Sequence, residues 1–160
     1  MTSSITWLDS YTIGINNIDQ QHKYLFVLIN KIIECDKSIK LQVFLEQLLA
    51  NTKKHFKAEE QLMEIIGYSD YKRHQEQHAL LIQRLDKKST EDLSDALIKE
   101  NLNNILVRYL FLHIIDTSLK LDKFLQTNFP PQKTTRQWYS LPEQNYNQRT
   151  VNYIQCISCN

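Results

Sequence analysis

Four stretches of the chain carry apolar residues at recurring steps of three and four. That spacing marks one face of a helix, whereas a strand would alternate apolar and polar residues at every second position. The stripes also hold some polar residues, and their members in chain order are Ile18, His22, Leu25, Ile29 and Ile32; Leu45, Leu48, Thr52, His55, Glu59, Leu62 and Ile66; Tyr71, His74, His78, Leu81 and Leu85; and Leu102, Leu106, Leu110, His113, Leu121 and Phe124. The pattern predicts an all-α protein with four amphipathic helices.

Residues that cap or end helices set the expected limits of these elements. Gly67 is a natural end for the second helix, and Ser89 or Thr90 is suited to cap the start of the fourth. The fourth helix should stop before Pro130, because proline cannot continue a helix. Four such helices with short connections favour an up-down-up-down four-helix bundle.

Two less regular segments flank the predicted bundle. Residues 1–16 form a short N-terminal arm, and residues 132–160 are rich in Gln, Asn, Thr and Ser with no clear period. Such a composition is typical of an irregular extension. We therefore expect a bundle domain over residues 1–129 and a polar C-terminal extension over residues 130–160.

Composition agrees with a helical protein and narrows its partners. The chain has 160 residues with only 2 Gly and 3 Pro, fewer turn formers than a β-rich domain would need. Its formal net charge is +1, so nothing in the charge favours a nucleic acid or an anionic membrane as partner. No leader-like segment or long apolar run is evident, which predicts a cytoplasmic protein with reduced thiols.

The polar residues on the apolar stripes are the candidate functional residues. All 5 His of the chain lie there, and Glu59 follows His55 by one helical turn. A buried carboxylate without a partner is costly, whereas a bound metal ion removes that penalty. Imidazole and carboxylate are ligands that iron accepts, and bundles build metal sites from facing helices. The candidate metal ligands are therefore His22, His55, Glu59, His74, His78 and His113.

A simpler reading also exists for each histidine. A single His on an apolar stripe is more often a hydrogen-bonded core residue than a metal ligand. Five inward-facing His on four helices are a different case, because packing five neutral rings without a common partner would be unfavourable. Six donors also exceed the needs of one four-coordinate zinc ion and suit two six-coordinate ions.

With these residues in place, the chain resembles the hemerythrin family, in particular its single-domain bacterial type. The resemblance extends over about residues 7–125 and rests on Trp7, Gly14-Ile15, Ile18-Asp19-Gln20-Gln21-His22-Lys23 and Leu25-Phe26; on His55-Phe56-Lys57-Ala58-Glu59-Glu60, Met63 and Gly67-Tyr68; on His74-Gln75-Glu76-Gln77-His78; and on His113-Ile114. The combination of motifs is specific.

The resemblance implies a role for each matching residue. It implies two iron ions, one held by His74, His78 and His113, the other by His22 and His55, with Glu59 as the bridge. It implies further that O₂ binds at the less saturated iron. Leu110 and Ile114 flank His113 and would line an apolar ligand pocket; ordinary core packing explains them equally well.

One position departs from the family pattern. The family has a second bridging Asp five residues after the last His, and this chain has Ser118 there. The nearby Asp116 lies three residues after His113 and is either a substitute ligand or, as we prefer, a solvated or helix-pairing residue. We therefore expect weaker binding of the second iron, with one ion as the alternative to two.

Cys156 and Cys159 form a Cys-x-x-Cys near the C-terminus. The spacing suits a redox pair or half of a zinc site, but no further ligands accompany it, so inert thiols are the simpler interpretation. Cys35, late in the first helix, is expected to be a small, partly buried apolar residue.

The resemblance favours a non-enzymatic protein that binds O₂ reversibly for transport, storage or delivery. The alternative is a sensor of redox state, O₂ or nitric oxide, or iron-dependent peroxide chemistry at a site altered by Ser118. A protein partner is not predicted.

Overall fold

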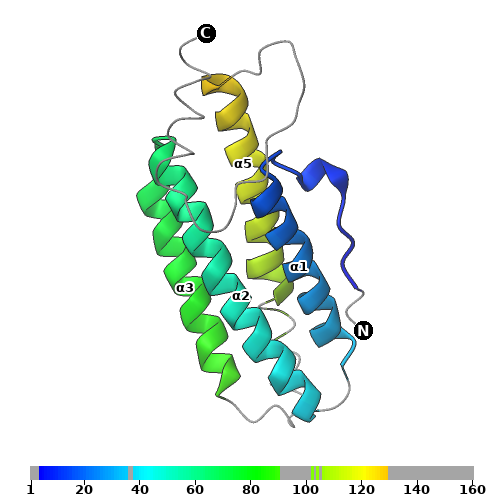
Figure 1. Ribbon diagram of the computed structural model, residues 1–160. Coiled ribbons are helices and arrows are strands. Elements are labelled where there is room, and N and C mark those ends of the chain that lie inside the picture. Colours follow the sequence, from blue (N-terminus) through cyan, green and yellow to red (C-terminus); the bar gives the residue numbers. More distant parts are fainter. Residues whose placement is uncertain (1–3, 36–37, 91–101, 103, 105, 130–160) are drawn as a thin grey trace.

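In the computed structural model the chain forms a bundle of long helices, and the structure describes residues 4–35, 38–90, 102, 104 and 106–129. The helices are α1 (Asn16–Ile33), α2 (Ser38–Ile65), α3 (Tyr71–Ser89) and α5 (Leu112–Asn128), the last preceded by a π-helical segment η2 (Leu106–Phe111). Successive helices run in alternating directions, and no strand occurs among the described residues (Figure 1). The predicted all-α up-down-up-down bundle is confirmed.

The N-terminal arm lies along α1 and is fastened to it at two points (Figure 1). The Asn30 side chain accepts a hydrogen bond from the Ile5 amide and donates one to the Ile5 carbonyl, both at 2.8 Å. The buried carboxylate of Asp19 accepts the amides of Ile13 and Gly14 at 2.9 and 3.1 Å. These bonds satisfy backbone groups ahead of α1 and bring the short 3-10 helix η1 (Asp9–Tyr11) against the bundle.

Two helix ends agree with the predictions, because α2 ends just before Gly67 and α5 ends at Asn128, ahead of Pro130. Gly67 has φ +66°, and the bonds from the amides of Gly67 and Tyr68 back to α2 end that helix as predicted. At the C-terminal end of α3 the hydroxyls of Ser89 and Thr90 donate to the carbonyls of Asp86 and Lys87, and whether either residue also caps the fourth helix stays a prediction. The start of the fourth helix lies outside the described residues.

Two apolar clusters fill the bundle, and the polar stripe residues lie between them. On α1, for example, His22 separates Ile18 in one cluster from Leu25 in the other. The larger cluster contains Leu25, Phe26, Leu28, Ile29, Ile32, Cys35, Leu41, Leu45, Leu48, Phe56, Leu81, Leu85, Leu102, Leu106, Leu110 and Ile114. The smaller contains Ile13, Ile18, Ala58, Leu62, Met63, Ile66, Leu121 and Leu125. The candidate site is thus a polar layer between two apolar ones.

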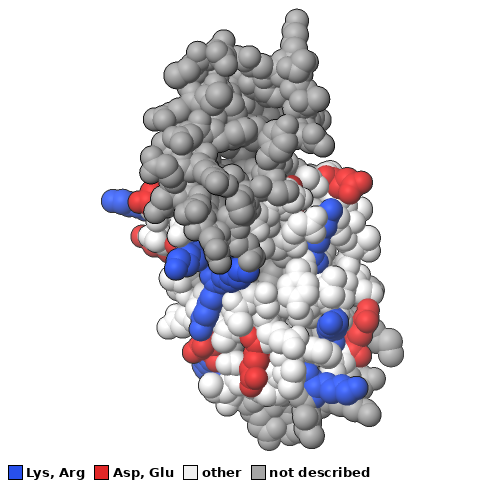
Figure 2. Space-filling model, in the orientation of Figure 1, with Lys and Arg blue, Asp and Glu red and all other residues white. Residues whose placement is uncertain are grey.

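The surface carries charges of both signs. On the face drawn in Figure 2, basic and acidic side chains lie among one another and do not separate into patches. No helix in the described part of the chain is long and apolar enough to cross a bilayer. Cys35, predicted as a partly buried residue late in the first helix, is buried and lies just after the end of α1. The predicted extension over 130–160, with Cys156 and Cys159, lies outside the described residues.

Candidate metal centre

The six predicted ligands converge from all four long helices. Two groups of ligand atoms form, each with its atoms within 4.8 Å of one another: Glu59, His74, His78 and His113 in the first, and His22, His55 and Glu59 in the second. Glu59 belongs to both groups. The helical period explains the convergence, because steps of three and four keep these side chains on the inward faces.

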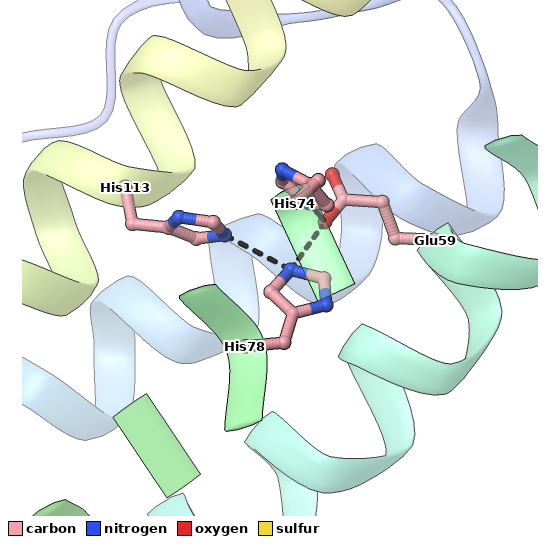
Figure 3. Close-up of side chains that lie close together, drawn as sticks. All are labelled: Glu59, His74, His78 and His113. Carbon is pink, nitrogen blue, oxygen red and sulfur yellow. Dashed lines mark hydrogen bonds and ion pairs between the residues drawn. The ribbon is translucent and has the colours of Figure 1, made fainter. Parts of the chain in front are cut away.

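In the first group the metal-facing atoms approach one another closely (Figure 3). Oε2 of Glu59 lies 3.1 Å from Nε2 of His74 and 3.2 Å from Nε2 of His78. Nε2 of His78 lies 3.0 Å from Nε2 of His113. Four donors from α2, α3 and α5 therefore surround one small space.

The second group is built in the same manner on α1 and α2. Nε2 of His22 lies 3.1 Å from Nε2 of His55. Nε2 of His55 is 3.8 Å from Oε2 of Glu59, one turn further along α2. The two groups thus adjoin through Glu59, whose position between them fits a bridging ligand.

Outer hydrogen bonds fix which ring nitrogen faces the site. Nδ1 of His55 lies 3.2 Å from Oε1 of Gln21, and Nδ1 of His78 lies 2.7 Å from Oε1 of Glu60. Because these oxygens accept hydrogen bonds, each Nδ1 donates, and the Nε2 lone pair is left to face the metal site. Such outer partners orient histidine ligands in metal sites generally. Their roles were missed in the sequence, although each stands beside a predicted ligand.

The burial of the site makes a bound cation the simplest partner for Glu59. Its side chain is fully buried, and burial alone would raise its pKa, but the close approach of Nε2 of His74 and His78 holds the pKa well below its usual range. Oε1 of this ionised carboxylate has no hydrogen-bond partner. A buried, unpaired oxygen is unfavourable. A metal ion between the two groups would satisfy it, so the donor set fits a metal.

His22 and His113 are kept neutral and are therefore able to bind metal. Burial lowers the pKa of His22 to about 4, and the nearby charge of Glu59 offsets this only in part. Burial likewise lowers the pKa of His113 to about 3. At neutral pH both rings therefore have a free lone pair, which metal binding requires.

Apolar and aromatic side chains close around the ligands. The Phe56 ring stacks on the His78 ring with centroids 3.6 Å apart. Leu110 and Ile114, on either side of His113, are fully buried in the larger apolar cluster. Both residues therefore pack in the apolar core, and the expectation that they line a pocket for a bound ligand stays a prediction.

The residues near the position of the missing bridging carboxylate differ in their burial and in what their side chains contact. Asp116 is exposed, and its carboxylate accepts a bond from Lys120 at 2.6 Å, so it pairs along the helix and does not face the ligands. Ser118 belongs to α5, and its side chain lies outside the described part. Thr117 is the buried residue here: Oγ1 lies 3.5 Å from Nε2 of His113. Sequence reasoning missed Thr117, though its place one turn after His113 was the available signal.

Fold and site together define a helical-bundle protein with a histidine-rich, carboxylate-linked site that can hold metal ions. Comparison with known proteins agrees. Residues 13–116 match the model of the hemerythrin HHE cation binding domain. The match ends before Thr117 and Ser118.

Similar proteins include a bacteriohemerythrin of Pseudomonas aeruginosa, 31% identical over 113 residues, covering 69% of this chain and 74% of the relative. A hemerythrin-like protein of Naegleria gruberi is 36% identical over 103 residues, covering 64% of this chain and 84% of the relative. A bacteriohemerythrin of Clostridium acetobutylicum is 28% identical over 120 residues, covering 69% and 92%. The chain belongs to the hemerythrin family.

Proposed function

We propose that this protein holds a pair of non-heme iron ions and binds O₂ reversibly as a carrier, not as an enzyme. The observation that carries the proposal is Glu59, a buried carboxylate shared by two groups of histidines, with one oxygen lacking any hydrogen-bond partner. Bound ferrous ions supply the electrons with which a small oxidant is held. The names and cation-binding domain of the relatives support the same class of chemistry.

Each part of the chain has a distinct task in this proposal. His74, His78 and His113 would hold one ion and His22 and His55 the other, with Glu59 between them. Gln21 and Glu60 keep two of the rings in the metal-binding tautomer.

Exclusion of water is the task of the apolar layer. Phe56, Leu110 and Ile114 are buried beside the ligands, and an apolar surrounding limits the entry of water and protons, which would promote irreversible oxidation of the iron by O₂. Transport, storage and delivery of O₂ all fit this design. The proposal includes a cytoplasmic location, as expected from the sequence.

One observation favours redox or sensing chemistry as a second candidate. An open groove of about 420 Å³ between α3 and α5 includes His113 in its lining, and His113 is only partly buried. A metal ion at a site that solvent can reach exchanges and is oxidised more readily than a metal ion at a sealed site.

The test is anaerobic loading with ferrous iron, followed by an iron count and visible spectra before and after admitting air. About two irons per chain and a charge-transfer band that disappears on removing O₂ are expected for a carrier. A band that forms and never reverses favours the second candidate. Absence of iron binding would contradict both.

Glu59→Gln sharpens this test, because it keeps the shape of the side chain and removes its charge. We expect the variant to fold but to hold fewer than two irons. Glu64→Gln, at an exposed position of the same helix, is the matched control and should load as the wild type does. Full loading of Glu59→Gln would exclude Glu59 as the bridge.

A further inference from the structure

Thr117 is a polar residue at the metal centre to which the proposed function gives no task. It lies in α5 one turn after His113 and is 4% exposed. Its Oγ1 is 3.5 Å from Nε2 of His113, and the same nitrogen is 3.0 Å from Nε2 of His78. The hydroxyl therefore lies beside the space on which these histidines converge. At 3.5 Å its contact with His113 is at the outer limit of a hydrogen bond, so the hydroxyl is available to a better acceptor.

The charges of the candidate ligands leave room for a further anion. Glu59 is the one carboxylate in the two groups of ligand atoms that the described residues form. Two divalent cations bring four positive charges, and one carboxylate cancels only one of them. An excess of charge in a buried site is unfavourable unless an anion accompanies it.

Neighbouring acidic residues do not fill this need. Glu60 bonds to Nδ1 of His78, on the side of the ring that faces away from the ligand atoms. Asp116 is exposed and paired with Lys120. The chain thus places a neutral hydroxyl, and not a carboxylate, next to His113.

A route from solvent leads to this side of the centre. The groove between α3 and α5 is lined by His113 together with Leu80, Leu81, Leu112, Gln77, Arg84 and Asp116. The other five ligands are buried, so His113 is the ligand that a small solute reaches first. The lining holds the cation of Arg84 as well as Asp116, and Asp116 is paired with Lys120, so the groove is open to a small anion.

Building on the proposed function, we propose that the loaded centre takes up a small carboxylate ion, such as formate or acetate, from solution. Thr117 binds it by donating a hydrogen bond from its hydroxyl to one carboxylate oxygen. The second oxygen and the negative charge remain for the metal site. The ion thereby supplies from solution the carboxylate that the chain itself does not provide.

The test measures ferrous iron affinity by chelator competition under anaerobic conditions, in a buffer free of carboxylates, with and without added acetate. We expect acetate to tighten iron binding by about tenfold, which is ~1.4 kcal/mol. Thr117→Val keeps the shape of the side chain without the hydroxyl and should lose this response. Thr117→Ser keeps the hydroxyl and should retain it.

Matched controls separate the possible outcomes. Thr127→Val, on the exposed face of the same helix, should respond to acetate as the wild type does. Thr117→Asp supplies a carboxylate within the chain and should bind iron tightly without acetate. Iron binding that is indifferent to acetate in the wild type, or an unchanged response in Thr117→Val, overturns the proposal while leaving the proposed function intact. Absence of iron binding with and without acetate overturns both.

Discussion

The outer partners of the histidines decide how the ligand atoms are presented. An imidazole can carry its proton on either nitrogen, and the wrong tautomer would direct an N–H bond at the metal. Gln21 and Glu60 prevent this at His55 and His78, each from the helix next to that of the histidine. The affinity of the centre therefore depends on residues that never touch the metal.

Glu60→Ala removes the acceptor for Nδ1 of His78 and should weaken iron binding by about 10- to 100-fold. Glu60→Gln keeps a side-chain oxygen that accepts the same bond, so we expect a smaller loss. Chelator competition measures both, with Glu64→Ala as a control on the exposed side of α2. Equal affinities for Glu60→Ala and the wild type would show that the bond to His78 has no influence.

The sequence was sufficient to predict which side chains meet, but not what surrounds them. His55 and Glu59 share a helical face by spacing alone, and the structure brings them together with the other four predicted residues. The role of Gln21 could not be predicted in this way, because it depends on how α1 is rotated against α2. Thr117 could not be predicted for a related reason, because only the packing of α5 shows that Thr117 faces the ligands while Asp116, beside it, lies outward.

The fourth helix shows how a local irregularity preserves a buried face. Leu102, Leu106, Leu110 and Ile114 recur at steps of four and are all fully buried. On a regular α-helix each such step drifts by about 40° around the axis, so the four would not share one face. The π-helical segment η2 takes more residues per turn and offsets that drift. A regular helix was predicted here, because the periodic pattern does not distinguish the two forms.

Gly67→Ala tests the turn between α2 and α3. Gly67 has φ +66°, and a Cβ there would meet no atom within 4 Å, so the cost is conformational and not steric crowding by neighbours. We expect the free energy of unfolding to fall by ~1 kcal/mol. Gly67→Asn should cost less, since asparagine tolerates this conformation better. Urea unfolding compares the three proteins, and a Gly67→Ala protein as stable as the wild type would contradict the expectation.

A polar layer enclosed by two apolar clusters makes the stability of the metal-free protein sensitive to acid. The pKa of His22 is lowered by burial from 6.5 to about 4, and that of His113 to about 3. Between about pH 6.5 and these values the unfolded chain binds protons that the folded chain does not. Stability therefore falls as the pH is lowered through this range, and these two groups contribute no slope above it.

We expect urea unfolding of the metal-free protein to show this loss of stability between neutral pH and about pH 4. His22→Gln cannot take up the proton and should give a shallower dependence. Asp19, whose pKa is raised by burial, changes stability in the opposite direction and is present in both proteins, so it does not cause a difference between them. Identical pH profiles for the variant and the wild type would contradict the prediction.

The π-helical segment gives the fourth helix an uneven tolerance to changes in chain length. A π turn holds one residue more than an α turn needs, so a single deletion within 106–111 could be absorbed by tightening η2 while His113 keeps its place. The same deletion between His113 and Thr117 would turn the following residues by about 100° around the axis. This helix can therefore lose a residue ahead of His113, whereas the turn after His113 has no residue to spare.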